Sequence, residues 1–347
     1  MGRLSFLLAC LLSTLYVLAQ GPGGVTGAEL WHIATATTNN TDSSYVWRDY
    51  SGDSTRFISI ENDHLIVRPQ SEMQSFNFHP ALHFDSISGK SLLQHTNLAQ
   101  TTLIGVFAPD SEMINPWNED TIYTANGRNG EDICMLTDSV YDLSLGHLYH
   151  KYHNNNDTLF NETALRIITY ERANVPNHSV WDEPNMSSIQ FNANGKRFIG
   201  YSPEMIVYGR ILSQLERRKV ETYLAMKYGI TLDWSYILPN GQLIWDRTDS
   251  IYHHRVTAIA KYSDSSLFQP LSSTSYEEDS CVSFLPPNDS FYNKSTYNKP
   301  SSNRLLVLGH EYGYNLPNNK YMIWGDNGDS LSYKTTNGSP WRIMKRK

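Results

Sequence analysis

The sequence predicts a mostly-β protein with one long helix past its middle. Short runs rich in β-branched and aromatic residues recur along the chain, and turn-forming pairs such as Asn126-Gly127 and Asn194-Gly195 separate them. Hydrophobic residues make up 40% of the 347 residues and charged residues only 18%. This composition supplies enough apolar material for packed cores and excludes an intrinsically disordered chain. The number and spacing of the runs indicate a sandwich or a barrel.

The first nineteen residues predict a secretory signal peptide. Arg3 supplies the positive start, an apolar run extends from Leu4 to Ala19, and Gln20 begins an abrupt polar segment. The run is too short for a membrane-spanning helix, which needs about 20 apolar residues. We therefore expect a secreted or cell-surface protein, associated with the outer membrane, with no transmembrane segment in the mature chain.

The net charge limits the classes of binding partner, and the cysteine content limits the number of disulfide bonds. The formal net charge is −7 and no basic block occurs, which excludes nucleic acid as a partner. After removal of residues 1–19, only Cys134 and Cys281 remain, too few for a disulfide framework. The sequence leaves their pairing open.

Strands are predicted on both sides of the helix. The segment before residue 210 has its clearest runs at 57–60, 64–67, 102–107, 165–170 and 205–208. The segment after residue 231 has them at 241–246, 255–260, 304–309, 321–326 and 341–344. Residues 263–300 are polar and rich in Ser, Asn and Pro, so a loop-heavy stretch is expected there. Trp245 and Trp324 fall within predicted strands, which favours the core or a domain interface for both.

The helix has a defined start and end. Ser213 and Glu216 form the pattern of a capping box, and Gly229 follows the last turn, where a left-handed residue is favoured. Lys227 lies in that turn, where a cation suits the helix dipole. The charged residues 216–219 are expected mainly on the solvated face. Apolar residues at helical spacing predict the buried stripe: Leu215, Val220, Tyr223, Leu224 and Tyr228.

Residues 204–232 carry three consecutive patterns. They read E-x-I-x-Y from Glu204, L-S-x-x-E-R from Leu212, and Y-L-A-x-K-Y-G-I-T-L from Tyr223. Together they resemble the end of the laminin-G/concanavalin-A-like domain found in exported surface proteins of Bacteroidetes. The resemblance implies a jelly-roll sandwich over residues 20–232 that closes with the helix.

The remainder is similar to the uncharacterised β-module that follows in the same proteins. The matching pieces include Trp245-Asp246 and the run from Ile323 to Asp326. The family usually has a Gly-Arg-Asp-Asp turn where this chain has residues 260–264, so no role of that turn is carried over. The resemblance predicts a smaller β-module over 233–347. It also implies that the family's module continues past Trp341-Arg342, so we expect a truncated, incomplete module here.

A catalytic function is the second reading. A glycosidase needs two carboxylates flanking the scissile bond, about 5–5.5 Å apart in a retaining enzyme. No predicted strand alternates carboxylates, and no zinc helix, P-loop or serine-elbow pattern occurs. An enzyme would therefore need carboxylates from different strands. A third reading is a structural spacer without a ligand.

Binding is the reading that the sequence favours. Trp117, Asn118, Asp120 and Asn126 combine an aromatic face with amide and carboxylate groups, the chemistry that recognises sugars. The same oxygen atoms suit calcium, so the cofactor is left open between calcium and none. The alternative for this stretch is an ordinary loop whose Trp folds onto the core. We predict a non-catalytic surface protein that mediates adhesion by binding a glycan or an extracellular protein.

Overall fold

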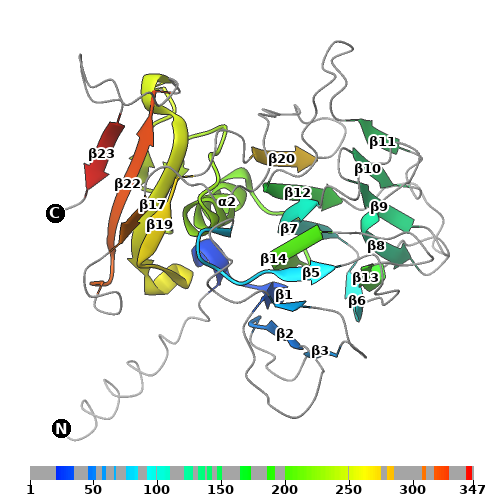
Figure 1. The fold of residues 1–347 in the computed structure, drawn as a ribbon. Coiled ribbons are helices and arrows are strands. Elements are labelled where there is room, and N and C mark those ends of the chain that lie inside the picture. Colours follow the sequence, from blue (N-terminus) through cyan, green and yellow to red (C-terminus); the bar gives the residue numbers. More distant parts are fainter. Residues whose placement is uncertain are drawn as a thin grey trace, which may run out of the picture.

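A computed structural model describes much of the chain. The described residues are 21–34, 46–51, 57–59, 66–67, 76–84, 92–98, 100–109, 121–127, 132–136, 139–142, 147–150, 165–172, 186–191, 200–248, 250–274, 280–284, 307–309, 316–327 and 341–345. Within them strands predominate around one α-helix, which confirms the predicted mostly-β class (Figure 1).

A nine-stranded sheet forms the centre of the molecule. Its main path runs β20-β12-β7-β14-β1-β2-β3, with β5 added beside β14 and β4 beside β5. The strands are β1 (Ala28–Ile33), β2 (Val46–Asp49), β3 (Phe57–Ser59), β4 (Ile66–Val67), β5 (Leu82–Phe84), β7 (Thr101–Pro109), β12 (Arg166–Arg172), β14 (Gly200–Tyr208) and β20 (Ser280–Phe284). Neighbouring strands are antiparallel except β12 and β20, which run parallel.

A six-stranded antiparallel sheet lies on one side of this central sheet, and the helix α2 (Gln214–Tyr228) lies on the other (Figure 1). The strand order is β11-β10-β9-β8-β13-β6. The strands are β6 (Leu92–Leu98), β8 (Thr121–Gly127), β9 (Asp132–Leu136), β10 (Ser139–Asp142), β11 (His147–His150) and β13 (Met186–Phe191). Residues 202–208 of β14 are all buried, which means that both faces of the central sheet are covered.

The chain after the helix forms three further sheets. A four-stranded sheet has the order β18-β17-β22-β23, and two-stranded sheets pair β15 with β16 and β19 with β21. The strands are β15 (Tyr236–Ile237), β16 (Leu243–Trp245), β17 (His254–Tyr262), β18 (Leu267–Gln269), β19 (Leu271–Ser273), β21 (Val307–Gly309), β22 (Lys320–Asp326) and β23 (Trp341–Lys345). The described residues also contain short 3₁₀ turns. η1 (Pro22–Gly24) precedes the helix, and η5 (Ser250–Tyr252) and η6 (Ser263–Ser265) follow it. Trp245 and Trp324 are both buried, as predicted.

The stretch expected to be loop-heavy contains regular structure. Within residues 263–300 the structure describes η6, β18, β19 and β20. β20 aligns with β12 from Ser280 opposite Arg166 to Phe284 opposite Tyr170, so a late segment of the chain extends the central sheet. The sequence does not predict the strand Ser280–Phe284, because Ser and Asn are frequent around it. This strand forms by pairing with a partner that is distant in the sequence.

One hydrophobic cluster links the parts of the chain before and after residue 232. It includes Ile104 and Ile206 from the central sheet, Leu224 from α2, and Trp245 and Ile323 from the later sheets. The predicted boundary at residue 232 therefore lies within a continuous core. The division into modules stays a prediction.

The ends of α2 follow the sequence prediction. Ser213 accepts a hydrogen bond from the Glu216 backbone N–H, and the Glu216 side chain accepts one from the Ser213 backbone N–H. Gly229 closes the helix in the left-handed conformation, at φ 68°. The capping box and the terminal glycine are thus confirmed.

The faces of α2 differ from the prediction. Leu215 is 52% exposed, and residues 216–219 are half-buried instead of solvated. Residues Val220 to Tyr228 are all buried, because the central sheet covers one side of the helix and the later strands cover the other. The first turn extends beyond this enclosed region, which explains the exposure of Leu215.

The helix cap gives a first prediction. Ser213→Ala should lower the free energy of unfolding by about 1 kcal/mol, because the Glu216 amide loses its acceptor at the helix start. Urea denaturation measures this change. Gln214→Ala at the next, exposed position is the control and should stay within about 0.5 kcal/mol of the parent. Equal losses in the two variants would show that the cap contributes nothing specific.

The buried half of the helix gives a second prediction with an internal control. Leu224 is fully buried in the shared core, so Leu224→Ala should cost about 2–5 kcal/mol of unfolding free energy. Leu215→Ala is the same substitution at an exposed site on the same helix and should cost no more than about 0.5 kcal/mol. Denaturant melts that show a negligible effect for both variants would contradict the enclosure of α2.

Candidate functional site

Residues of the sequence patterns that begin at Glu204 form a buried ionic network. Glu204 lies on β14 and is fully buried beneath α2. Its Oε2 accepts hydrogen bonds from Lys227 Nζ at 2.6 Å and from the Tyr228 hydroxyl at 2.8 Å. Its Oε1 accepts from Trp31 Nε1 at 2.6 Å and from the Tyr223 hydroxyl at 2.9 Å. The carboxylate is therefore satisfied by donors from β1 and α2, as a buried charge requires.

Lys227 is held by more than its ion pair. Its Nζ also donates to the Tyr223 hydroxyl at 3.0 Å and lies 5.3 Å from the centres of both the Tyr223 and Tyr228 rings. Burial, followed by the charge of Glu204, raises the pKa of each tyrosine hydroxyl well above its usual range. Both tyrosines therefore remain protonated donors. Lys227 lies in the last turn of α2, as predicted, and it is buried because its ammonium pairs with the Glu204 carboxylate.

Hydrogen bonds of a tight turn at Asn77 connect the end of α2 to the later strands. Asn77 has a left-handed backbone, with φ 52°, and is fully buried. Its Nδ2 donates to the Lys227 carbonyl at 2.9 Å, and its Oδ1 accepts from the Ser273 N–H at 2.8 Å. Gln269 Nε2 donates to the Asn77 carbonyl at 3.1 Å. Sequence reasoning missed this residue, whose one signal is the tolerance of Asn for left-handed conformations.

His79 in the same turn is held neutral. Burial, and then the positive charge of Lys227, lowers the pKa of the imidazole to about 3. The ring lies edge-on to Tyr228, with centroids 5.3 Å apart, and hydrogen-bonds to Gln269. An imidazole with this pKa does not exchange protons near neutral pH, so it serves packing.

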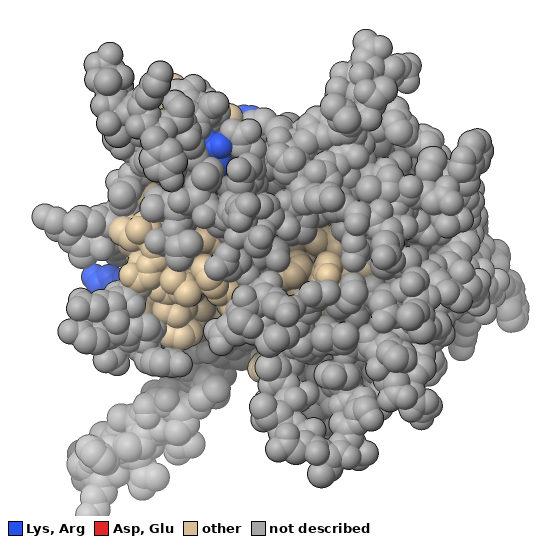
Figure 2. All heavy atoms as spheres, viewed as in Figure 1, with Lys and Arg blue, Asp and Glu red and all other residues tan. Residues whose placement is uncertain are grey.

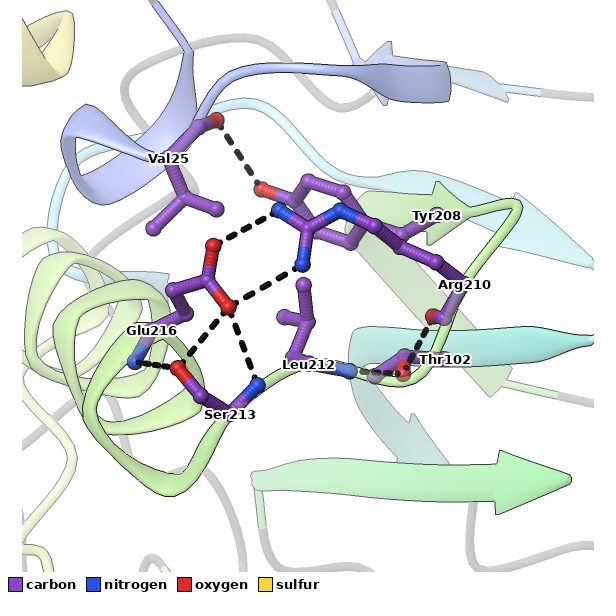
Figure 3. A network of polar contacts seen from close by, with 7 residues as sticks. All are labelled: Val25, Thr102, Tyr208, Arg210, Leu212, Ser213 and Glu216. Carbon is purple, nitrogen blue, oxygen red and sulfur yellow. Dashed lines mark hydrogen bonds and ion pairs between the residues drawn. The ribbon is translucent and has the colours of Figure 1, made fainter. Parts of the chain in front are cut away.

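A second polar network fixes the turn between β14 and α2 (Figure 3). The Arg210 guanidinium donates to both oxygens of Glu216, at 2.7 and 3.0 Å. Hydrogen bonds from Arg210 lower the pKa of the Glu216 carboxyl to about 2. Thr102 Oγ1 on β7 donates to the Arg210 carbonyl and accepts from the Leu212 N–H, at 2.9 and 3.0 Å. The turn is thereby tied to the central sheet.

The later strands contain their own buried ion pair. Arg255 donates to Asp326 through both Nε and Nη2, the latter at 2.8 Å, and both side chains are buried. Nearby, His253 accepts from Trp245 Nε1 at 3.1 Å and hydrogen-bonds to the Leu232 carbonyl. From the sequence, the adjacent histidines His253 and His254 are predicted to lie at the surface and not to serve as ligands. The structure instead buries His253, because the turn after η5 brings its ring against Trp245.

The structure describes one of the four predicted ligand-binding residues, Asn126. Trp117, Asn118 and Asp120 fall outside the described residues. Asn126 lies near the end of β8, where its register partners are Ser188 on β13 and Asp132 on β9. Cys134 lies on β9 and Cys281 on β20, in different sheets.

Asn126 belongs to a polar row that crosses four strands of the six-stranded sheet. The register aligns His95, Ser188, Asn126 and Asp132. The next row aligns Ile189, Ala125 and Ile133 at its centre, and the row after that aligns Gln190, Thr124, Cys134 and Tyr141. Polar and apolar positions thus alternate at the centre of the sheet, whereas Gln94 and Asp142 flank the apolar row and Leu93 flanks the row through Thr124. We take the row through Asn126 and the row through Thr124 as the candidate site and call them the polar rows.

Among the described residues, no group of three or more His, Cys, Asp or Glu side chains is arranged to hold a metal ion. In the same part of the chain, no helix combines the length and apolar character needed to cross a bilayer.

Comparison with known proteins finds a family model that is similar to the later part of the chain. Residues 216–347 match the family model described as "Domain of unknown function (DUF8202)". The match begins within α2, earlier than the predicted boundary at residue 232. No protein of curated function matches the sequence.

Solved structures share only a distant likeness. Trypanosoma rangeli sialidase aligns with a TM-score of 0.33 and 12% identity over 57% of this chain and 33% of the sialidase chain. The botulinum neurotoxin type G receptor-binding domain aligns with a TM-score of 0.32 and 12% identity over 61% of this chain and 56% of its own. The binding domain of botulinum neurotoxin DC, solved with rat synaptotagmin II, aligns with a TM-score of 0.32 and 9% identity over 86% of this chain and 71% of its own. The match thus spans about a third of the sialidase's length, and likeness at this level says nothing about activity.

The Glu204 network gives a third prediction. Lys227→Met leaves the Glu204 carboxylate buried without its cation and should cost about 3–5 kcal/mol of unfolding free energy. Adding Glu204→Gln to this variant should recover part of the loss, because the uncompensated charge is gone. Lys219→Met, half-buried on the same helix, is the matched control and should stay within about 1 kcal/mol of the parent. Similar denaturant melts for Lys227→Met and Lys219→Met would contradict the network's role.

Proposed function

We propose that this chain is a non-catalytic exported surface protein that binds an extended glycan along the polar rows of its six-stranded sheet. One observation supports this most directly, namely the alignment of His95, Ser188, Asn126 and Asp132 across four strands. Amide, hydroxyl and carboxylate groups are the usual partners of sugar hydroxyls, and an aromatic residue supplies a face for the sugar ring. Tyr141 belongs to the second polar row and meets that requirement.

The alternation of rows favours a ligand on this sheet. An antiparallel sheet that covers a core on one face and meets water on the other alternates apolar and polar positions. The row of Ile189, Ala125 and Ile133 has the composition of a core-facing row, and the row through Asn126 has that of a solvent-facing row. A polar strip along the row through Asn126 follows from this assignment.

The span of β8 favours a ligand of several sugar units. Trp117, Asn118 and Asp120 directly precede β8, and Asn126 lies near its far end. At about 3.3 Å per residue, the path from Thr121 to Asn126 covers roughly 17 Å. A single sugar ring is too small to contact both ends of this path, so a ligand that lies along the whole of β8 is an oligosaccharide.

The carboxylates in the described residues do not favour catalysis. Glu171 on β12 and Glu221 on α2 are neighbouring acids, and burial is the main cause that raises the pKa of the Glu221 carboxyl to about 7. This resembles the acid pair of a glycosidase. Both side chains are buried between the helix and the sheet, at 4% and 0% exposure, where a polysaccharide has no access. We assign the pair to the contact between helix and sheet.

The fourth prediction tests binding directly. The mature chain, residues 20–347, should bind oligosaccharides on a glycan array and should bind monosaccharides much more weakly. Measurements with and without calcium determine whether the ion takes part. Asn126→Ala should weaken binding about two- to tenfold, the effect of one lost hydrogen bond. Gln214→Ala, an exposed amide on α2, is the control and should leave the affinity unchanged.

Three results would overturn the proposal. Binding of an extracellular protein but of no glycan would change the class of ligand. Turnover of a polysaccharide would show an enzyme. Glycan binding that is insensitive to Asn126→Ala and equally to Asp132→Ala would place the site elsewhere on the molecule.

A further inference from the structure

The four-stranded sheet carries two lysines directly opposite each other. Lys261 on β17 is the register partner of Lys320 on β22, and on its other side it pairs with Phe268 on β18. Register partners project from the same face of a sheet, and neighbours along a strand project from opposite faces. The neighbours Ala260 and Tyr262 belong to the hydrophobic cluster. The two lysines and Phe268 therefore lie on the face that is turned away from the core.

This outer face is covered at one end and open at the other. In the first half of β17, Thr257 is buried, and its hydroxyl hydrogen-bonds to the Ser272 hydroxyl on β19 at 2.7 Å. At the far end of β17, Lys261 and Lys320 are half-buried and Phe268 is 39% exposed. Figure 2 shows Lys or Arg atoms at the surface on the side of the molecule where Figure 1 shows β22. A ligand can therefore reach this end of the sheet.

The placement of the two lysines opposes folding. Opposite residues in an antiparallel pair have Cβ atoms about 5 Å apart, and like charges there are destabilising. Within the described part of the chain, no ion pair joins either ammonium to an acid. Lysines that prevent aggregation belong to edge strands, whereas β17 and β22 are the inner strands of this sheet. A bound anion offsets the repulsion between the two charges.

The groups around the lysines are held in place. Lys261 Nζ lies 5.6 Å from the centre of the Phe268 ring, which is a cation–π contact. Asn318 is exposed and lies two residues before Lys320. Its Oδ1 accepts hydrogen bonds from the Ser263 N–H at 2.9 Å and from the Ser263 hydroxyl at 3.0 Å. These bonds orient the amide, whose Nδ2 is a further donor. We call Lys261, Lys320, Asn318 and Phe268 the lysine patch.

We propose that the lysine patch binds a single acidic group, a carboxylate or a sulfate, on a glycan. Two ammonium groups and one amide supply donors for the anionic oxygens. The exposed part of the Phe268 ring supplies apolar surface for the adjoining sugar. The patch lies on a different sheet from the polar rows, so it is a second site that does not depend on them.

The charge of the whole chain limits the charge of the ligand. The formal net charge is −7, so the rest of the protein repels a densely charged polyanion. A glycan with widely spaced acidic groups meets less of this repulsion and can place one group between Lys261 and Lys320. The preferred ligand is therefore a sparsely charged acidic polysaccharide.

Oligosaccharides that differ only in charge test the proposal on the mature chain, residues 20–347. Hyaluronan carries a carboxylate on every second sugar, and kappa-carrageenan carries a sulfate on every second sugar. Their carboxyl-reduced and desulfated forms are neutral controls. In isothermal titration calorimetry, at least one acidic form should bind about tenfold more tightly than its neutral form. Added salt should weaken this binding, because it screens exposed charges.

Substitutions locate the site. Lys261→Gln and Lys320→Gln should each weaken binding of the acidic oligosaccharide about two- to fivefold, the effect of one exposed ion pair. Arg247→Gln removes the same charge from an exposed position after β16 and should leave the affinity unchanged. In urea melts, Lys320→Gln should be at least as stable as the parent, because the repulsion from Lys261 is relieved. Loss of binding in this variant is then separate from loss of folding.

Several outcomes would overturn the proposal. They are equal binding of acidic and neutral forms, no binding of either acidic form, and acidic binding that neither lysine substitution weakens. Binding to phosphatidylglycerol vesicles but to neither acidic oligosaccharide would assign the patch to a lipid surface and would overturn it as well. Asn126→Ala should leave acidic binding unchanged. Failure of the polar rows and failure of the lysine patch are therefore distinguishable.

Discussion

The position of α2 depends on the charge of Glu204. A carboxylate in this environment is tolerated only when donors surround it, and here they come from Trp31 on β1 and from Tyr223, Lys227 and Tyr228 on α2. Three residues from successive turns of one helix must therefore face the two carboxylate oxygens of Glu204 on β14. This requirement sets both the rotation of the helix and its position along the strand. The contact of Asn77 with α2 depends on this helix position, because Asn77 Nδ2 donates to the carbonyl of Lys227.

The burial of α2 on all sides shows what the helix contributes to the architecture. A helix that covers only one face of a sheet keeps a polar side, but residues Val220 to Tyr228 have none that is exposed. The later strands close over the side that the central sheet leaves open, and both share one hydrophobic cluster. The family match that begins at residue 216 includes most of this helix. The helix is therefore a common core element of the two segments that flank it.

Local features of the sequence predicted local structure well. The Ser213 cap, the Gly229 end and strands such as β7, β12 and β14 depend on nearby residues, and all are confirmed. Features that depend on distant partners were missed. Lys227 is buried because of Glu204, Leu215 is exposed because the enclosure starts one turn later, and Asn77 acquires its role only when Ser273 arrives beside it. For the candidate site, the sequence supplied Asn126 as a residue type, and only the register aligned it with Ser188 and Asp132.

The parallel pairing of β20 with β12 has a consequence for the order of folding. Strands β7, β12 and β14 are synthesised before β20, so the edge of β12 that pairs with β20 stays open until the later segment arrives. Pairing over so long a sequence separation is slow, since the intervening chain must first be ordered. The central sheet therefore reaches its full width late, after most of the chain has been synthesised. During that interval the open edge of β12 is exposed to pairing with strands of other chains.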